Sequence, residues 1–360
     1  MTDRAAILAH AAALRARFET AGAQVVETPV LQSAETLLDL YGEEIRARAY
    51  VTSDALRGEQ MLRPDFTVPV VQMHMAEGAE PARYTYAGEV FRRQEHDPAR
   101  ANEYLQVGYE VFDRTDPARS DAEVFSQFSQ IVAPLKLRAA TGDIGILMAA
   151  VRGLDTTEAR KSALLRHIWR PRRFRALLDR YAGRVPLDKA RAALIAGDAP
   201  VCTAPFIGRR SQHEIDSRIA LLRADAATAP LSSVEVDLLE ALLNVRETVP
   251  FALRHLKDLS FDMPQIEGAV ASLADRTEAM AARGIAVDDL PFEANFGRTS
   301  MEYYDGFVFG FYSSERPDLP PIATGGRYDA LTRRLGDGGE IPAVGGVLRP
   351  DLMLQLEAGA

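Results

Sequence analysis

Residues 83–113, RYTYAGEVFRRQEHDPARANEYLQVGYEVFD, are the stretch that decides the fold of this chain. Aromatic and β-branched residues gather at its two ends, and a charged segment with a proline, residues 94–102, lies between them. Two apolar runs that flank a loop of this kind predict a long antiparallel hairpin. We therefore expect the rest of the chain to be arranged around this hairpin.

The second predicted strand, residues 104–112, carries a polar face. Because successive side chains of a strand point to opposite faces, Gln106, Gly108 and Glu110 share one face, and apolar residues share the other. An amide, a gap without a side chain and a carboxylate in a row would make a floor for a small polar ligand. Arg92, near the end of the opposite strand, could contact an anion. The alternative is an amphipathic hairpin whose polar face is exposed to solvent.

The composition of the chain is that of an ordinary globular protein. Its 360 residues are 47% hydrophobic and 26% charged, which suffices for one large domain and a subdomain. The net charge of −9 argues against a surface that attracts nucleic acid everywhere. The single cysteine, Cys202, excludes an intrachain disulfide and a multi-cysteine metal site. The sequence contains no Walker loop, HExxH or GxSxG motif, and we expect neither a cofactor nor a metal.

The sequence also bears on the location of the protein. Its first residues carry charges and lack the long apolar core of a signal peptide. No run approaches the roughly 18 apolar residues that a membrane helix needs. We therefore expect a cytoplasmic protein without a membrane segment.

The hairpin resembles motif 2 of the class II aminoacyl-tRNA synthetases in their histidyl form, on the pair Phe91-Arg92 and the run LQVGYEVF at residues 105–112. Near the N-terminus, a predicted helix is followed by a short strand over residues 24–27 and by Pro29. This order resembles motif 1, which forms the dimer interface of those enzymes, although a helix, a strand and a proline are also a common combination.

A second stretch, MLRPDFTVPVVQMH at residues 61–74, resembles the LRPE-x-T element of histidyl-tRNA synthetases, with Asp65 in place of the glutamate. The resemblance implies that Asp65 and Thr67 hold the amino group of histidine. From the residues alone, an equally good interpretation is that both residues cap a helix over residues 68–79.

Two C-terminal stretches carry the resemblance further. SMEYYDGFVFGFY at residues 300–312 resembles the histidyl-specific RGLDYY element, with Tyr303 and Tyr304 present. ATGGRYDAL at residues 323–331 matches the GGRYD element. Its glycines predict a tight turn into a helix, and Tyr328 can face the same pocket.

Local patterns predict further elements of the core. Thr2 and Asp3 can cap a first helix, which Gly22 ends. Residues 120–135 are expected to form a helix, and residues 142–147 a buried strand or turn.

The resemblance implies an α+β fold, a class II synthetase-like antiparallel sheet of six or seven strands flanked by helices. It covers residues 1–150 and 263–360, which we assign to the core. Between them, residues 151–262 have helical periodicity and predict a mainly helical insertion. The basic stretch at residues 166–181 could bind phosphate, RNA or an acidic partner, or form a solvated helix face. No segment matches the anticodon-binding domain of the synthetases.

The positions that bind and polarise ATP in the synthetases differ here. Thr299 stands at the position of the catalytic arginine, and Arg298, one place earlier, would point to the opposite face of a strand. The motif 3 region begins as IPAVGG at residues 341–346, but Leu352 replaces its arginine, and Arg349 lies three residues earlier. Because such cations stabilise charge at a phosphoryl centre, their loss predicts that the chain does not form an adenylate.

This combination of retained and lost positions resembles the histidyl-tRNA synthetase-like regulatory subunits of ATP phosphoribosyltransferase. That family implies a regulatory protein that is not itself an enzyme. It implies a homodimer that forms a hetero-oligomer with the short-form catalytic subunit, which needs this partner for activity. Histidine would be the effector that inhibits the first step of histidine biosynthesis, and no tRNA is expected to bind.

The same resemblance implies where histidine binds, and it implies no catalytic residue. A carboxylate suits an imidazole N–H, and only Gly108 leaves room among the side chains of its strand face. The predicted contacts are Asp65, Thr67 and Gln106 for the amino group, Glu110 and Tyr304 for the imidazole, and Tyr328 as the residue that closes the site.

Two other classes of function stay open. An enzyme would retain weak activation of histidine or another ligase activity, for which only Arg92 remains of the expected cations. An RNA-binding protein would use the basic stretch at residues 166–181 and bind tRNA with a salt-dependent affinity. The sequence does not indicate which surface would contact the catalytic subunit.

Overall fold

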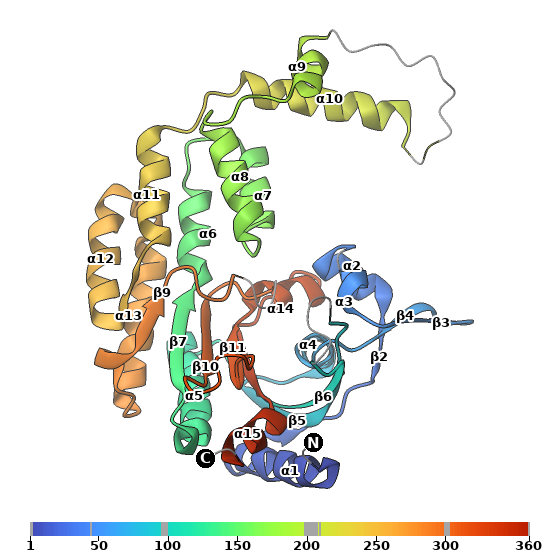
Figure 1. Ribbon diagram of the computed structural model, residues 1–360, viewed down its shortest axis with the longest axis vertical. Coiled ribbons are helices and arrows are strands. Elements are labelled where there is room, and N and C mark those ends of the chain that lie inside the picture. The colour runs from blue at the N-terminus through green and yellow to red at the C-terminus, as the bar shows by residue number, and fades with distance from the viewer. Residues whose placement is uncertain are drawn as a thin grey trace.

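The structure, a computed structural model shown in Figure 1, describes residues 3–43, 45–94, 100–197, 208, 210–298 and 303–358. Several residues named in the sequence predictions lie outside this described part. They are Thr2, Cys202, Thr299, the first three residues of the stretch 300–312 and the middle of the hairpin loop, residues 95–99.

A sheet of nine strands, counted over the described residues, forms the centre of the molecule. In chain order its strands are β1 Gln24–Val25, β5 Ala82–Phe91, β6 Glu103–Phe112, β7 Arg138–Asp143, β8 Arg246–Thr248, β9 Pro291–Glu293, β10 Phe307–Tyr312, β11 Ala323–Arg327 and β12 Ala343–Leu348. Their order in space is β1-β5-β6-β12-β11-β10-β7-β9-β8. The pairs β1–β5 and β7–β9 are parallel, and the others are antiparallel.

The α+β class is the expected one, but the expected six or seven strands were too few. Strands β8 and β9 at one edge contain three residues each. Segments of this length are too short for a period of two to be recognised. A separate sheet of three short strands projects from the body (Figure 1); its strands are β2 Leu31–Ser33, β3 Val51–Asp54 and β4 Gly58–Leu62, in the order β2-β4-β3.

The central hairpin is confirmed, since β5 and β6 pair antiparallel over ten residues each. Gly108 lies opposite Tyr86, and Gln106 lies opposite Gly88. Both faces of β6 are covered: Gln106 is 0% exposed and Glu110 is 1% exposed. The alternative of a hairpin with a solvated polar face is therefore wrong.

Helices α1 Arg4–Thr20 and α5 Pro117–Val132 cover one face of the sheet. The ring of Phe18 stacks on Tyr109 with 5.0 Å between centroids, and Phe128 meets Phe309 at 5.5 Å. As predicted, Asp3 caps α1, since its side chain accepts from the N–H of Ala5. These apolar contacts anchor the helices to the face of β6 that is opposite to Gln106 and Glu110.

Helix α4, Thr67–Glu77, lies on the other side and confirms the helix predicted after Asp65. The Asp65 carboxylate accepts from the N–H of Val68 at 3.3 Å. This contact satisfies one of the free N–H groups at the start of the helix. The segment before α4 therefore brings Asp65 and Thr67 to the polar face of the hairpin.

Two local predictions were wrong. Residues 142–147 are neither a continuous strand nor a turn, because Asp143 ends β7 and caps helix α6, Ile144–Arg152, by accepting from the N–H of Gly145. Gly325 and Gly326 do not form a turn into a helix. They lie within β11, where a Cβ atom at either position would overlap neighbouring atoms, among them the Gly345 carbonyl and the Tyr304 ring. Close packing, not a turn, explains this glycine pair.

The remaining helices account for most of the predicted insertion and for the connections of the core. They are α2 Ala34–Tyr41, α3 Ile45–Arg48, α7 Glu158–Arg166, α8 Pro171–Tyr181, α9 Lys189–Ala196, α10 Gln212–Ala227, α11 Ser233–Leu243, α12 Val249–Asp262, α13 Glu267–Ala282, α14 Asp329–Leu335 and α15 Pro350–Glu357, with short 3-10 turns at Ala133–Leu135, Pro264–Ile266 and Val287–Asp289. None of the helices within the described ranges is long and apolar enough to cross a membrane.

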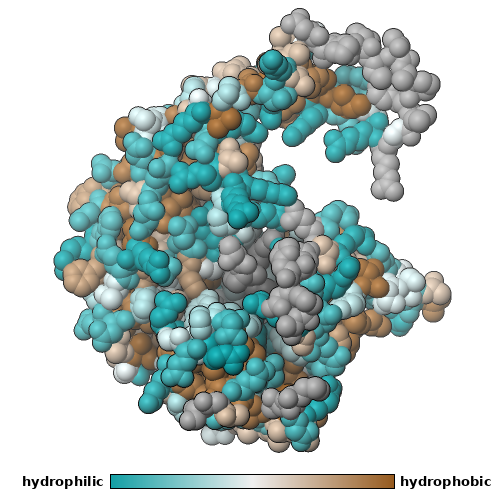
Figure 2. Space-filling view, in the orientation of Figure 1, coloured by the Kyte–Doolittle hydropathy of each residue, from teal (hydrophilic) through white to brown (hydrophobic). Residues whose placement is uncertain are grey.

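Figure 1 shows α9 and α10 as an arm that stands away from the body. Figure 2 shows an open space between this arm and the body, bordered on this face mainly by hydrophilic side chains. The predicted insertion, residues 151–262, also contains β8, which pairs with β9 of the sheet. The boundaries between core and insertion remain a prediction.

The basic stretch at residues 166–181 spans the end of α7 and all of α8. Phe174, Leu178 and Tyr181 of α8 are buried. Arg175 pairs with Glu240 at 2.5 Å, and Arg180 lies 3.7 Å from Asp225. These contacts fit a helix face whose arginines pair with acidic neighbours, the alternative to a nucleic-acid surface.

Candidate amino-acid site and the adjoining cavity

Glu110 is the centre of a buried polar network on the face of β6 opposite to α1. Its carboxylate accepts hydrogen bonds from Tyr328 at 2.6 Å, from Tyr86 at 2.8 Å and from Thr67 at 3.1 Å. Burial raises the pKa of Glu110 to about 7, although the three hydroxyl donors oppose the shift. The structure therefore brings three of the predicted site residues, Thr67, Glu110 and Tyr328, into direct contact.

Asp65 is a second buried carboxylate of this site. Its Oδ2 atom accepts from the hydroxyl of Tyr41 at 3.2 Å, while its Oδ1 atom accepts from the N–H of Val68. Burial raises the pKa of Asp65, and the nearby positive charge of Arg92 counteracts part of that effect. Asp65 thus acts as a helix cap, and the same carboxylate lies close to Arg92.

Gln106 is fully buried, and neither its Oε1 nor its Nε2 atom has a hydrogen-bond partner among the described residues. A buried amide without partners costs free energy, and most such groups in proteins are satisfied. Gln106 is on the same face of β6 as Glu110, two residues from Gly108. It is therefore a polar group in need of a partner at the predicted position.

Tyrosines form the wall of the site. The ring of Tyr303 lies 4.9 Å from that of Tyr304 and 6.0 Å from that of Tyr328, measured between centroids. Burial raises the pKa of Tyr304, as do the charges of Glu110 and Asp65. The backbone carbonyl of Tyr304 accepts from Nε1 of Trp169, in the connection between α7 and α8, at 3.0 Å. This wall is thereby linked to the helical region.

Gly108 does not leave the open gap that the sequence suggested. The ring of Tyr86 fills the space beside it, and a Cβ atom at position 108 would overlap this ring. Tyr86 in turn stacks on Phe66 with 4.2 Å between centroids. Gly345 of β12 has a similar role, because a Cβ atom there would overlap Oε2 of Glu110. Both glycines make room for the network itself.

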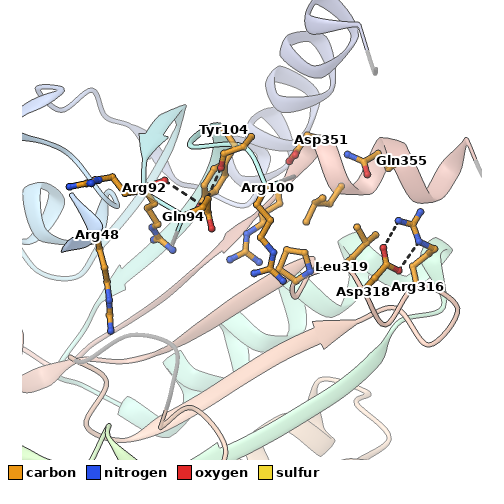
Figure 3. Close-up of a pocket in the computed structure, with 15 residues that line it drawn as sticks. Arg48, Arg92, Gln94, Arg100, Tyr104, Arg316, Asp318, Leu319, Asp351 and Gln355 are labelled. Atoms are coloured by element: carbon orange, nitrogen blue, oxygen red, sulfur yellow. Dashed lines mark hydrogen bonds and ion pairs between the residues drawn. The ribbon is translucent and has the colours of Figure 1, made fainter. Parts of the chain in front are cut away.

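Arginines surround a cavity of about 510 Å³ next to this network. Figure 3 shows it, with Arg100 directed toward Leu319 and Arg316 paired with Asp318. The arginines that line it come from four separate segments and are Arg48, Arg92, Arg93, Arg100, Arg316 and Arg349. We call it the arginine-lined cavity.

Arg92 lies between the two regions. Its Nε atom donates to the carbonyl of Pro64 at 2.6 Å. Burial disfavours the charged form of Arg92, but Tyr104, Asp65 and Tyr303 outweigh it, so that its pKa is raised. The predicted anion contact is thus adjacent to Asp65 on one side and to the arginine-lined cavity on the other.

Arg298 has a structural role on the other side of the tyrosine wall. It follows β9 after a turn and is not part of a strand, so the argument from strand alternation does not apply to it. Its guanidinium donates to the carbonyl of Ile168 at 2.7 Å and to Asn295 at 2.8 Å. Burial, together with the charge of Arg175, lowers the pKa of Arg298 to about 10.

Leu352 lines the arginine-lined cavity at the position where the synthetase pattern has an arginine. Arg349, three residues earlier, lines the same cavity and donates to the carbonyl of Pro321. Within the described residues, no group of three or more histidine, cysteine or acidic side chains could hold a metal ion.

Sequence reasoning missed several residues of the two regions. Tyr86 could have been found, because it is directly opposite Gly108 in the hairpin register. Tyr41 and Gly345 come from other segments, and no local pattern connects them with Glu110. The same is true of most arginines of the cavity, which meet only in the folded chain.

A family model described as histidyl-tRNA synthetase matches residues 2–196 and 215–352, which is most of the chain. Together with the sheet and the Glu110 network, this match places the protein in the histidyl-tRNA synthetase-like class. Two solved structures share the fold along nearly the whole chain. One is described as an ATP phosphoribosyltransferase regulatory subunit/histidyl-tRNA synthetase from Bacillus halodurans; its TM-score is 0.67, its identity is 21%, and the match covers 99% of this chain and 81% of that one.

The second structure is a histidine–tRNA ligase subunit from Alicyclobacillus acidocaldarius, with a TM-score of 0.63, 22% identity and coverage of 100% and 95%. Proteins with similar sequences identify the family within this class. The ATP phosphoribosyltransferase regulatory subunit of Brucella anthropi is 32% identical over 360 residues, 92% of this chain and 93% of the relative. That of Brucella ovis is 31% identical over 354 residues, with coverage of 92% and 93%. The chain belongs to the family of ATP phosphoribosyltransferase regulatory subunits.

Proposed function

We propose that this chain binds histidine and, through that binding, regulates a short-form ATP phosphoribosyltransferase catalytic subunit in histidine biosynthesis. The observation that carries the proposal is the convergence of Asp65, Thr67, Glu110 and Tyr328 in one buried network, next to the unpaired amide of Gln106. Family membership supports the partner, because the relatives are named as regulatory subunits of this enzyme.

The proposed pose follows from the charges of the site. The ammonium group of histidine is held by Asp65, Thr67 and the Oε1 atom of Gln106, and its carboxylate lies toward Arg92. The imidazole lies at Glu110 and Tyr304, where a carboxylate can accept from a ring N–H. Tyr328 closes the site. Charge-assisted hydrogen bonds of this kind are stronger than neutral ones.

The chain in this proposal regulates and does not catalyse. Leu352 supplies no cation at the position of the motif 3 arginine, although it lines the adjoining cavity. Loss of one such stabilising group commonly costs a few kcal/mol, roughly 10²-fold or more in rate. Histidine-dependent pyrophosphate exchange above background would contradict this part of the proposal.

The tyrosine wall, formed by Tyr303, Tyr304 and Tyr328, connects the proposed histidine site to the helical region. Trp169 joins the helical region to the carbonyl of Tyr304. Regulation requires that histidine interact differently with two states of the complex. A shift of Tyr304 on binding would be passed to α7 and α8 through this hydrogen bond. Because Trp169 is the only tryptophan in the sequence, its fluorescence should report histidine binding directly.

A homodimer in the cytoplasm is part of the proposal. Val25, Val30 and Leu31, which lie around Pro29 in the motif 1 region, are large apolar side chains exposed in the single chain. Exposed apolar clusters often mark protein interfaces, and homo-oligomers are usually closed two-fold pairs. Sedimentation that detects only a 39.5 kDa species at micromolar concentration would contradict the dimer.

The decisive experiment uses the complete complex. The short-form catalytic subunit from the same genome is assayed alone, with this chain, and with this chain plus histidine. We expect activity only in the complex and inhibition when histidine is added. A catalytic subunit that is fully active alone and equally sensitive to histidine would contradict the proposal. Trp169 fluorescence, recorded on this chain alone, separates a failure of histidine binding from a failure of coupling.

A further inference from the structure

Helix α14 begins directly after Tyr328, a residue of the Glu110 network. The residue at this N-cap position commonly accepts a hydrogen bond from one of the first N–H groups of the helix, which have no partner within the helix itself. The side chain of Tyr328 forms no such bond, because its hydroxyl donates to Glu110 at 2.6 Å. The start of α14 therefore needs an acceptor from another part of the chain.

Asp305 supplies this acceptor. Its Oδ1 atom accepts from the N–H of Asp329 at 3.0 Å, and its Oδ2 atom accepts from the N–H of Ala330 at 2.6 Å. Asp305 lies 24 residues before Asp329 and directly follows Tyr304 of the tyrosine wall. One carboxyl group thus satisfies two free N–H groups of a helix whose own N-cap side chain serves the Glu110 network.

The contacts of Asp305 lie on both sides of Tyr328 along the chain. The N–H of Asp305 donates to the carbonyl of Arg327 at 3.0 Å, while its side chain accepts from Asp329. The turn that carries Asp305 is itself attached to the core, because the carbonyl of Gly306 accepts from the N–H of Ile144 at 2.9 Å. Asp305 therefore holds the residues immediately before and immediately after Tyr328.

Strand β12 also contacts this segment, but it uses other groups. The N–H of Tyr328 donates to the carbonyl of Ala343 at 2.9 Å, and the carboxylate of Asp329 accepts from the N–H of Ala343 at 2.9 Å. These bonds hold the segment against the neighbouring strand. They do not satisfy the N–H groups at the start of α14, so they do not replace the contacts of Asp305.

We propose that Asp305 is a positioning residue of the amino-acid site, which holds Tyr328 so that its hydroxyl reaches Glu110. Asp305 touches no ligand in this arrangement and acts through Tyr328. It caps α14 from a distant segment and thereby leaves the N-cap position to a residue that serves the site. The inference rests on the proposed function, because it concerns the same histidine site.

The test is calorimetric titration of histidine into the full chain and its Asp305 variants. Asp305→Ala removes both acceptors and should weaken histidine binding roughly tenfold. Asp305→Asn keeps one oxygen acceptor and should restore part of the affinity. The matched control is Asp188→Ala, since Asp188 likewise accepts from two N–H groups, those of Ala190 and Arg191, at the start of α9. This control should bind histidine as the wild type does.

A double variant separates positioning of Tyr328 from a general structural role. Tyr328→Phe removes the hydroxyl that donates to Glu110. If Asp305 acts through this hydroxyl, Asp305→Ala should weaken histidine binding by less than about twofold in the Tyr328→Phe background, because the two changes then remove the same interaction. Circular dichroism and urea unfolding establish that each variant is folded. If Asp305→Ala does not fold, the same pair of measurements is made with Asp305→Asn.

Two results would overturn this inference alone. One is a folded Asp305 variant that binds histidine as tightly as the wild type. The other is an equal loss of affinity with and without the Tyr328 hydroxyl, since Asp305 would then act by another route. A wild-type chain that does not bind histidine would overturn the proposed function, and this inference with it.

Discussion

The Glu110 network and the arginine-lined cavity lie next to each other and are built in opposite ways. In the network, two buried carboxylates are surrounded by hydroxyl groups, and Glu110 alone accepts three hydrogen bonds. In the cavity, arginines outnumber acids three to one among the described lining residues. The first is a closed set of neutral hydroxyl donors around two buried carboxyl groups. The second is an excess of positive charge around a space.

This difference separates a tightly packed polar network from a cationic cavity within one sheet. Tight packing around Glu110 suits a ligand of fixed shape. Arg92 is the one described residue that we place in both. Variants on either side of Arg92 should therefore show whether the network alone, or the network together with the cavity, determines histidine binding.

The largest effect is expected from filling the space beside Glu110. Gly345→Ala would drive a methyl group into the Glu110 carboxylate, and Gly108→Ala would drive one into the Tyr86 ring. Overpacking of this kind costs about 1–3 kcal/mol of folding free energy and displaces the network. We expect no measurable histidine binding by calorimetry, with a lower free energy of unfolding in urea.

The matched control for these variants is Gly268→Ala in α13, where a Cβ atom meets nothing within 4 Å. It should keep histidine affinity and raise stability slightly, since alanine favours helices by up to about 1 kcal/mol over glycine. Unchanged histidine affinity in folded Gly345→Ala would mean that histidine binds elsewhere, for example at an interface between subunits.

A smaller but more selective effect is expected at Glu110 itself. Glu110→Gln keeps the size of the side chain and removes its charge. Loss of a charge-assisted hydrogen bond to the imidazole should weaken histidine binding by about 1.5–3 kcal/mol, roughly 10- to 150-fold. The variant should still assemble with the catalytic subunit and resist inhibition by histidine.

The converse variant completes this comparison. The Arg93→Gln, Arg100→Gln double variant changes two exposed arginines of the cavity and should keep histidine affinity, measured by calorimetry. If it binds histidine as weakly as Glu110→Gln does, the two regions form a single site. In that case the distinction between the network and the cavity would be wrong.

The sequence predicted which residues meet in the Glu110 network better than it predicted the cavity, for a physical reason. Gln106, Gly108 and Glu110 lie on one strand, so a period of two is enough to place them on one face. Asp65 and Thr67 are two residues apart at a helix start, where their types are informative. The sequence pattern did not give the position of the Tyr86 ring. In the structure this ring fills the space beside Gly108, which the sequence had suggested was open to a ligand.

The cavity could not be predicted in the same way. Its arginines come from the end of α3, the hairpin loop, the β10–β11 connection and the start of α15. The pairing of β6 with β12, and of β12 with β11, brings the hairpin loop, the β10–β11 connection and the start of α15 together. The sequence shows leucine at position 352, where the synthetase pattern has an arginine. It does not show that arginines from other segments line the same cavity as Leu352. The fold was easier to predict because the ten-residue strands of the central hairpin have a clear alternating pattern. The three-residue strands β8 and β9 at the edge of the sheet are too short to show such a pattern.

A moderate effect on histidine binding is expected from Arg92→Gln. The change removes a cation near the proposed histidine carboxylate and also from the cavity. We expect roughly tenfold weaker histidine binding, since one charge-assisted contact is lost. Calorimetry with histidine checks this. Unchanged histidine affinity would remove Arg92 from the proposed histidine site.

The smallest effect concerns pH. Burial raises the pKa of Glu110 to about 7, so that its carboxylate is only partly ionised near neutral pH. If the ionised form accepts from the imidazole, histidine affinity should rise by about fourfold between pH 6.5 and pH 8, because the ionised fraction increases by that factor. Calorimetry at the two pH values measures this rise. Glu110→Gln should lack it, and a wild-type affinity that falls over the same interval would contradict the assigned role.

Folding stability should change in the opposite direction over the pH range below neutrality. The folded chain holds a proton on Glu110 up to about pH 7, whereas the unfolded chain releases it near 4.5. Between these values the folded state binds more protons, so the free energy of unfolding decreases as pH rises, by at most about 3 kcal/mol, and is level above pH 7. Asp305, whose pKa is also raised to about 7 by burial, contributes in the same sense. The contribution of Glu110 is therefore the difference between wild type and Glu110→Gln in urea unfolding at pH 5.5 and pH 8. If the two proteins lose the same stability over this interval, Glu110 is ionised throughout, and the proposed pH dependence of histidine binding fails with it.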